Sequence, residues 1–303
     1  MDKGSRPPPL TLVNRASGSV AADHQRVMSS VARALKGAGI DGPIELVAGD
    51  RLAARAKAAT GAGAELVIAA GGDGTVSAVA GALVGTRAVL GILPLGTLNH
   101  LARDLGIPFD LGQAAAVIGA GQQRVIDVAR LNDRIFVNNS AIGLYPLFVA
   151  DREGQEQRLG RSKRLSMFVA GLRTLARFHH HRLTLTVDEG RSETIETPLL
   201  FVGNNDYRLD LGSAGQRDSI SDARLSVIVM RRMGRAGFFI AMLRALTGRS
   251  LPGDMIKLDD VQRLTVASRR SCLTVSSDGE TERLAPPLDY RIDPAALRVM
   301  APG

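Results

Sequence analysis

The sequence predicts an α/β fold of two domains, and three observations support this. In the first 123 residues, short apolar strands alternate with alanine-rich helices. From residue 124 onward, strands dominate. The chain has 303 residues and is 45% hydrophobic, which is enough apolar material for two cores. We therefore expect an N-terminal domain of residues 1–123 and a C-terminal domain of residues 124–292.

The N-terminal domain is predicted to be a parallel sheet with helices on both faces, because strands and helices alternate there. Apolar runs of strand length occur at residues 10–13, 64–70 and 88–94. The expected helices are residues 27–38, 52–59, 76–84 and 112–120.

The C-terminal domain is predicted to be an antiparallel β-sandwich. Clustered strands of this sort are typical of a sandwich or a barrel. The expected strands are residues 124–131, 135–139, 182–187, 195–202, 225–230, 261–267 and 272–276.

A glycine-rich turn follows the second of the apolar runs. Its sequence is Gly71-Gly72-Asp73-Gly74-Thr75, and a helix is expected to begin directly after it. Glycines let backbone N–H groups approach phosphate oxygens, and a helix N-terminus adds partial positive charge there. The carboxylate of Asp73 would repel bare phosphate, which indicates a metal ion or a proton transfer nearby. A tight turn without a ligand is the alternative.

Two further polar turns are expected at the same edge of the sheet. Residues 96–99 follow the third apolar run, and Thr97 could cap the helix after it. Residues 14–18, which include Asn14, Ser17 and Gly18, follow the first apolar run. Open α/β sheets bind ligands at the carboxyl ends of their strands, so the three turns predict one phosphate site.

These motifs resemble the diacylglycerol kinase catalytic-domain family, which includes bacterial soluble lipid kinases and sphingosine kinases. The resemblance runs along essentially the whole chain. It implies an NAD kinase/diacylglycerol kinase-like fold, in which residues 293–303 return to the first domain. It also implies ATP and Mg²⁺ as cofactors and a lipid as the substrate. The matching segments are residues 14–18, 71–75, 96–99, Arg103, 105–108, Asp127, 136–139, 142–143, 203–205 and 277–280.

The resemblance also implies roles for individual residues. Glu280 is similar to the family's proton acceptor, although Ser277-Asp278-Gly279-Glu280 is also a typical hairpin turn. Asp73 would act through Mg²⁺ or an ordered water, and Asp127 would belong to the same network. The implied nucleotide-binding residues are Asn14, Ser17, Gly18, Gly71, Gly72, Asp73, Gly74, Thr75, Gly96, Thr97 and Asn99.

Three positions depart from the family's pattern. His100 stands where an aspartate is frequent, and Glu45-Leu46 stands where many bacterial members have a nucleotide-contacting threonine. Bacterial members hold a structural Mg²⁺ at an Asp-Gly sequence, whereas this chain has Asp222-Ala223-Arg224. The remaining candidate ligands for that ion are Asp222 and the backbone carbonyls of Ser219 and Arg224.

The net charge of +8 predicts contact with an anionic partner. Basic and apolar residues are interleaved in residues 158–182 and 231–244, a pattern typical of helices lying on anionic membranes. Ordinary amphipathic helices packed on the sandwich are the alternative. Aromatic residues make up only 4% of the chain, which disfavours nucleic-acid binding by base stacking.

The remaining features predict a cytoplasmic protein that associates peripherally with membranes. Cys272 is the only cysteine, so no internal disulfide can form. The polar, proline-rich start does not resemble a signal peptide, and no apolar run approaches the roughly 20 residues of a membrane span. The consecutive histidines 179–181 cannot face one metal from a regular element. An exposed sandwich edge would allow two chains to pair as a homodimer.

The sequence therefore predicts phosphoryl transfer from ATP to a lipid hydroxyl, with the protein supplying mainly positioning and charge neutralisation. The candidate acceptors are diacylglycerol, monoacylglycerol, phosphatidylglycerol, sphingoid bases and ceramide. Two alternatives remain: a small-molecule kinase similar to NAD kinases, which share the Gly-Gly-Asp-Gly turn, and a nucleotide- and lipid-binding protein without catalysis.

Overall fold

The computed structural model describes residues 7–17, 20, 23–143, 180–207, 217, 219–231, 234, 237, 240 and 253–303. The chain divides into two compact units. The first comprises Met1–Val128 and Asp293–Gly303, and the second comprises Ala129–Ile292. The sequence predicts that the first domain ends at residue 123 and that the chain returns to it at residue 293.

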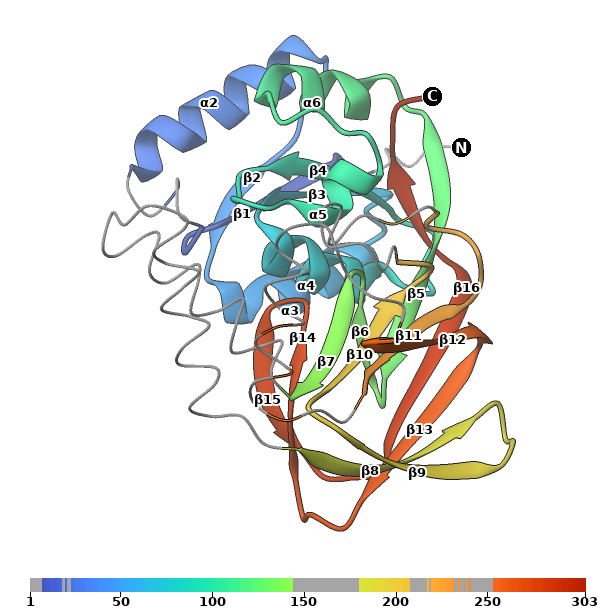
Figure 1. The fold of residues 1–303 in the computed structure, drawn as a ribbon. Coiled ribbons are helices and arrows are strands. Elements are labelled where there is room, and N and C mark those ends of the chain that lie inside the picture. The colour runs from blue at the N-terminus through green and yellow to red at the C-terminus, as the bar shows by residue number, and fades with distance from the viewer. Residues whose placement is uncertain are drawn as a thin grey trace. The chain divides into compact units, whose positions relative to one another are not determined.

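The first unit contains a parallel sheet with the strand order β2-β1-β3-β4-β16 (Figure 1). Each neighbouring pair in this order is parallel. The last strand of the chain joins the sheet beside β4, where Arg298 lies opposite Val89. The strands are β1 (Leu10–Asn14), β2 (Ile44–Val47), β3 (Leu66–Gly71), β4 (Val89–Pro94) and β16 (Leu288–Met300).

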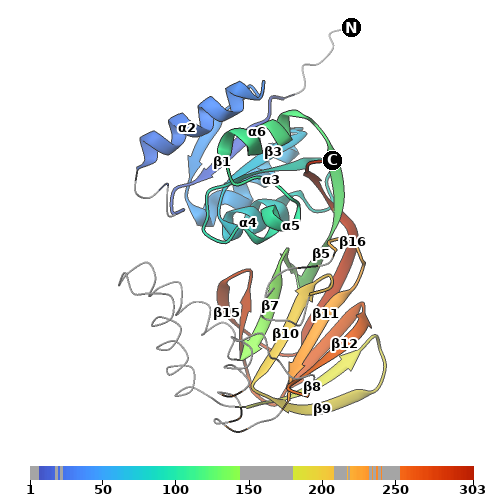
Figure 2. The ribbon, with the colours of Figure 1, turned by 45° about the horizontal axis from the view of Figure 1, so that its top comes forward.

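Helices cover both faces of this sheet. Helices α2 and α6 pack together on one face, and α3 and α4 pack together on the other (Figure 2). Carboxylates cap two of them: Asp23 accepts the Arg26 N–H before α2, and Asp110 accepts the Gln113 N–H before α6. The helices are α2 (His24–Gly37), η1 (Gly49–Arg51), α3 (Leu52–Gly61), α4 (Asp73–Leu83), α5 (His100–Asp104) and α6 (Leu111–Gly119).

The second unit is an antiparallel sandwich. One layer has the order β16-β13-β8-β9; in addition, β5 pairs with β16, and β6 pairs with β5. The other layer has the order β12-β11-β10-β7-β14-β15. The predicted fold class is therefore confirmed. The strands are β5 (Gln123–Leu131), β6 (Arg134–Phe136), β7 (Asn139–Gly143), β8 (His181–Val187), β9 (Ser192–Thr197), β10 (Leu199–Asn204), β11 (Leu225–Met230), β12 (Met255–Val261), β13 (Arg263–Ser268), β14 (Leu273–Ser277) and β15 (Glu280–Leu284).

One strand expected from the sequence is in fact two. The apolar pattern predicts a continuous strand over residues 195–202, but β9 ends at Thr197 and β10 begins at Leu199. Pro198, between them, has no N–H to donate to a ladder. The two strands lie in different layers of the sandwich, so the proline marks the place where the chain changes layer.

The sandwich core is built from alternate residues of facing strands. Val227 and Val202 of one layer pack with Leu264 of the other. Tyr290 is fully buried among them, with its ring edge-on to Phe136 at 6.3 Å between centroids. This alternation is the reason the strands carry one apolar and one more polar face.

Candidate phosphate-binding site

The two glycine turns of the first unit lie against each other. A Cβ atom on Gly96 would be 2.4 Å from the Cα of Gly72, which is closer than any real contact of this kind. The Leu95 N–H also donates to the Gly71 carbonyl at 2.9 Å. Only glycine allows this approach. Two strand-to-helix turns are therefore joined backbone to backbone at the carboxyl edge of β3 and β4.

Asp73 connects the two turns through its side chain. Its Oδ1 accepts the backbone N–H of His100 at 2.7 Å, across 27 residues of sequence. Asp73 is the first residue of α4, where a carboxylate interacts favourably with the helix dipole. One carboxylate oxygen thus holds the second turn in place.

Asn14 attaches the third turn to the first. Its amide nitrogen donates to the Thr75 hydroxyl at 2.9 Å, and its Oδ1 accepts the Ala16 N–H at 3.0 Å. Ser17 lies in the same turn, with its N–H on the Asn14 carbonyl. Gly18 lies outside the described residues. All three turns expected to meet are therefore linked by hydrogen bonds.

Thr75 and Thr97 differ in exposure. Thr75 is only 2% exposed, and a Cβ on Gly71 would fall 2.2 Å from its hydroxyl oxygen. The Thr75 side chain therefore packs over Gly71 and supports the turn. Thr97 is exposed, so its hydroxyl is open to a ligand.

Asn99 closes the second turn on itself. It adopts a left-handed backbone conformation with φ 48°, which asparagine tolerates better than most residues. Its Oδ1 accepts the Gly96 N–H at 3.1 Å, and its Nδ2 donates to the Gly96 carbonyl at 2.8 Å. Both polar ends of the amide are thus used within the turn, which gives Asn99 a structural function that the sequence alone did not indicate.

The N-terminus of α4 lies within this group of turns, where its partial positive charge favours anions. The helix begins after Gly72, and the N–H groups of Thr75 and Val76 turn inward to the Gly72 carbonyl. A helix of this length presents about half a positive charge at its start. Together with the exposed Gly74, this arrangement fits the oxygens of a phosphate chain.

Glu280 belongs to the second unit and lies at the tip of the β14–β15 hairpin. Ser277 pairs with Glu280, and Asp278 and Gly279 form the turn with φ values of 46° and 88°. The turn is thus the hairpin that the sequence suggests. Glu280 is exposed, and among the described residues no side chain forms an ion pair with it.

Asp278 holds this hairpin in place. Its carboxylate accepts the backbone N–H groups of Val137 and Asn138 at 2.8 Å each and that of Asn139 at 3.2 Å. The Asp278 N–H donates to the Asn139 carbonyl at 2.9 Å. The hairpin tip is therefore fixed by contacts to a segment 139 to 141 residues earlier.

A buried polar cluster supports the other side of that segment. The Asn204 amide donates to the Val137 carbonyl at 3.0 Å, and Arg217 donates to the same carbonyl at 2.7 Å. The Tyr207 hydroxyl donates to the Asn138 carbonyl at 3.0 Å, and the Arg217 guanidinium lies over the Tyr207 ring. Tyr207 and Arg217 were not identified from the sequence, since neither belongs to a recognisable local motif.

Family models match both parts of the chain. The diacylglycerol kinase catalytic domain matches residues 8–131, and the YegS C-terminal NAD kinase β-sandwich-like domain matches residues 149–301. The chain belongs to the diacylglycerol kinase catalytic-domain family.

Individual relatives of this lipid kinase family agree with the assignment. A diacylglycerol kinase from Bacillus subtilis is 28% identical over 226 residues, which is 73% of each chain. A "Probable lipid kinase YegS-like" from Klebsiella pneumoniae is 51% identical over 81 residues, but this covers only 26% of our chain and 27% of that protein. The crystal structure of a diacylglycerol kinase from Bacillus anthracis shares the fold, with a TM-score of 0.70 over 97% of both chains at 21% identity.

Two departures from the family pattern have a structural explanation. His100 contributes to the turn through its backbone, because its N–H donates to the Asp73 carboxylate. Its side chain is not needed for that contact. Glu45 forms a bidentate ion pair with Arg55 of α3, at 2.6 and 2.7 Å. This pair raises the pKa of Arg55, chiefly through the hydrogen bond to Glu45. Glu45 thus ties β2 to α3.

Asp127, in the first unit, is buried and forms a hydrogen bond with the backbone of the last strand, β16. It is 3% exposed, and its Oδ1 accepts the Ala295 N–H at 2.8 Å. Ala295 has a φ of 48°, so the bond stabilises a bend in β16 that alanine alone disfavours. The structure therefore shows Asp127 supporting the returning strand.

The described residues provide limited metal-binding capacity. Among them, no group of three or more His, Cys, Asp or Glu side chains is arranged to hold a metal ion. Mg²⁺ is often bound by one or two carboxylates together with substrate phosphates. Asp73, beside the glycine turns, fits that pattern for an ion that arrives with a nucleotide.

Other predictions concern residues that the structure does not describe. Most of the basic and apolar residues in 158–182 and 231–244 lie outside the described ranges, as does His179. In the part of the chain that is described, no helix is long and apolar enough to span a bilayer.

Proposed function

We propose that this member of the diacylglycerol kinase family transfers the γ-phosphoryl group of ATP to the hydroxyl of a lipid such as diacylglycerol. The observation that carries the proposal is the pair of touching glycine turns at the start of α4, linked by Asp73. Phosphoryl transfer depends on positioning and on neutralising charge, and this arrangement supplies both.

On the donor side, the backbone of Gly71, Gly72 and Gly74 would face the phosphates, and the exposed Thr97 hydroxyl would add a hydrogen bond. Thr75, Asn14 and Asn99 would act indirectly, because their side chains hold the turns together. Ser17, Gly18 and Gly96 would complete the turns around the nucleotide.

Asp73 would be the protein ligand nearest to the nucleotide's metal ion, either directly or through water. When bound, Mg²⁺ would neutralise the negative charge that develops during phosphoryl transfer. The hydrogen bond from the His100 N–H leaves the second carboxylate oxygen of Asp73 as the one to direct toward the ion.

On the acceptor side, Glu280 would take the proton of the attacking lipid hydroxyl. A general base must be ionised and held at a fixed place. Glu280 is exposed, and the carboxylate of Asp278 anchors its hairpin to three backbone N–H groups. These contacts support the assignment of Glu280 as base.

We also propose that the protein meets its substrate at an anionic membrane surface. A lipid acceptor resides in a membrane, and a net charge of +8 favours contact with anionic headgroups. Each Lys or Arg near such a surface contributes about 1 kcal/mol of attraction.

The direct test is transfer of label from γ-labelled ATP, with Mg²⁺, to a mixed-micelle panel of diacylglycerol, monoacylglycerol, phosphatidylglycerol, a sphingoid base and ceramide. Label in an organic extract identifies the acceptor. Glu280→Gln should lower turnover by about 10²- to 10⁴-fold and leave ATP binding intact. Glu193→Gln makes the same change at an exposed position on the edge strand β9 and should have wild-type activity.

Other results would contradict the proposal in distinct ways. Full activity of Glu280→Gln would exclude Glu280 as the base. Label transferred to NAD and to no lipid would indicate an NAD kinase-like enzyme. ATP binding without transfer to any acceptor would indicate a non-catalytic binding protein.

A further inference from the structure

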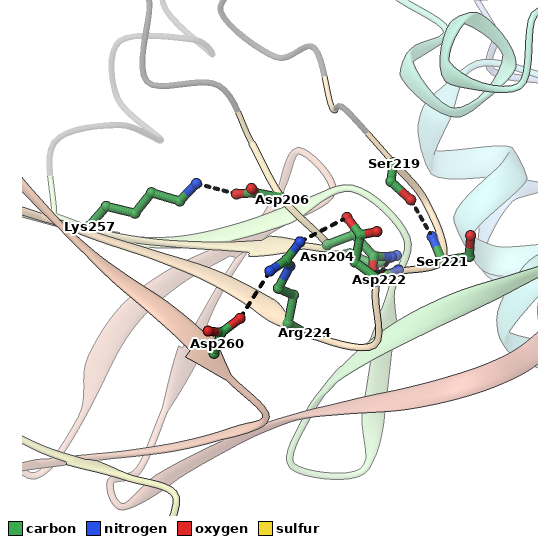
Figure 3. A network of polar contacts seen from close by, with 9 residues as sticks. Asn204, Asp206, Ser219, Ser221, Asp222, Arg224, Lys257 and Asp260 are labelled. Atoms are coloured by element: carbon green, nitrogen blue, oxygen red, sulfur yellow. Dashed lines mark hydrogen bonds and ion pairs between the residues drawn. The ribbon is translucent and has the colours of Figure 1, made fainter.

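A group of charged residues lies on or next to β10, β11 and β12, the three strands at one edge of the six-stranded layer of the sandwich (Figure 3). Asp206 follows β10, Asp222 and Arg224 precede β11, and Lys257 and Asp260 lie on β12. We call these five residues the Arg224 network. The three strands are neighbours, so three carboxylates and two cations from separate segments are brought together.

The two cations of the Arg224 network contact all three carboxylates. Arg224 Nη1 donates to Asp260 Oδ1 at 2.9 Å, and Arg224 Nη2 lies 3.7 Å from Asp222 Oδ2. Lys257 forms an ion pair with Asp206. The guanidinium of arginine is protonated in proteins at any ordinary pH. Arg224 therefore stays positively charged.

This is the segment where the family resemblance implies a structural Mg²⁺, bound by Asp222 and the carbonyls of Ser219 and Arg224. The contacts here do not fit such an ion. Mg²⁺ requires near-octahedral oxygen ligands at about 2.1 Å. The Asp222 carboxylate faces the Arg224 guanidinium instead. Because two positive groups repel each other, the guanidinium disfavours a divalent cation at the same carboxylate.

The backbone around Asp222 is also held by protein groups. The Arg224 carbonyl accepts the Asn205 N–H at 3.0 Å, and the Asn205 side chain accepts the Asp222 N–H at 2.9 Å. The Ser219 hydroxyl accepts the Ser221 N–H at 3.2 Å. Ala223 has a φ of 56°, so the loop keeps a left-handed residue at this position although it has no glycine there. Asn205 therefore holds the loop by hydrogen bonds to its backbone on both sides of Ala223.

We propose that Arg224, assisted by Lys257, replaces the divalent cation at this position, so that the protein itself supplies the positive charge beside the three carboxylates and binds no metal ion there. The loop before β11 then depends on an internal ion-pair network for its conformation. This inference concerns stability and metal dependence and does not depend on the proposed catalytic activity.

The first test measures the melting temperature, Tm, of the full chain without nucleotide, in EDTA and in excess Mg²⁺. A site occupied well above its Kd would raise Tm by several degrees, because the ion binds only the folded state. We expect the same Tm in both conditions. A rise with Mg²⁺ that is lost in Asp222→Asn would overturn the proposal, because it would place an ion at Asp222.

The second test removes the internal cation. Arg224→Gln should lower Tm in EDTA by more than Arg269→Gln, which makes the same change at an exposed turn position with no partner among the described residues. Arg224→Lys should restore most of the loss, because it keeps the charge. Mg²⁺ should then stabilise Arg224→Gln, since the vacated carboxylates become open to it.

The outcomes of the second test are equally decisive. If Arg224→Gln and Arg269→Gln have the same Tm, Arg224 does not neutralise this cluster. If Arg224→Gln is destabilised but Mg²⁺ gives it no stabilisation, the guanidinium does not stand in for the ion. Either result would refute the proposal.

Discussion

At the scale of single residues, a few polar side chains determine how the turns of the candidate site are held. Asp278 binds three backbone N–H groups, and Asn99 uses both ends of its amide within one turn. Asp73 and Asn14 each connect one turn to another. Such contacts restrict the backbone without covering it, so the turns stay accessible to ligands.

Tyr290 is the residue with the clearest dependence on pH. Burial raises its pKa well above the ordinary value of 10.0, while the hydrogen bond with Ser140, at 3.2 Å, acts in the opposite direction. A raised pKa means that the folded state keeps the proton after the unfolded state has lost it. The stability contributed by Tyr290 is therefore complete below pH 10 and is lost as pH rises above that value.

We predict that Tyr290→Phe lessens this alkaline loss. The wild type should lose up to about 1.4 kcal/mol per pH unit above pH 10 because of Tyr290, and the variant should not. At neutral pH the variant should be about 1 kcal/mol less stable, since Ser140 loses its partner. Urea unfolding at neutral pH and above pH 10 measures both effects. Parallel stability curves for the two proteins would contradict the prediction.

At the scale of secondary-structure elements, the site depends on two strand-to-helix turns that share their space. The β3–α4 turn and the β4–α5 turn touch at Gly72 and Gly96. Register sets this contact, because Gly71 lies opposite Pro94 in the parallel pair. A side chain at Gly96 would push the turns apart and misplace Asp73.

Gly96→Ala should therefore destabilise the first unit and weaken ATP binding. Forcing a methyl group against the Gly72 backbone should cost about 1–3 kcal/mol. Gly61→Ala is the matched control, because a Cβ there meets nothing within 4 Å and alanine favours the helix. Chemical unfolding and calorimetric ATP titration would measure the two effects. Equal stability and affinity for the two variants would show that the turns need no close contact.

At the scale of the whole molecule, positive charge exceeds negative charge by eight. An excess of this size attracts anionic surfaces over about one Debye length, which is roughly 10 Å at 0.1 M salt. The proposed lipid substrate makes a membrane the relevant surface.

We predict that the protein binds vesicles containing phosphatidylglycerol more tightly than vesicles of phosphatidylcholine. Two or three engaged basic residues, at about 1 kcal/mol each, correspond to a difference of roughly 30- to 150-fold. Added salt should reduce that difference in a co-sedimentation assay. Equal binding to both vesicle types, or no effect of salt, would argue against electrostatic attachment.

Features that depend on local chemistry are predictable from the sequence. The glycine turns, the strand–helix alternation and the Asp278-Gly279 hairpin could all be predicted, because each requires particular residues within a few positions. Three other features follow only from the tertiary structure: the contact of Gly72 with Gly96, the anchoring of Asp278 and the pairing of Arg224 with Asp260. These contacts join segments far apart in the chain, and local patterns contain no information about which distant groups the packing of strands will bring together.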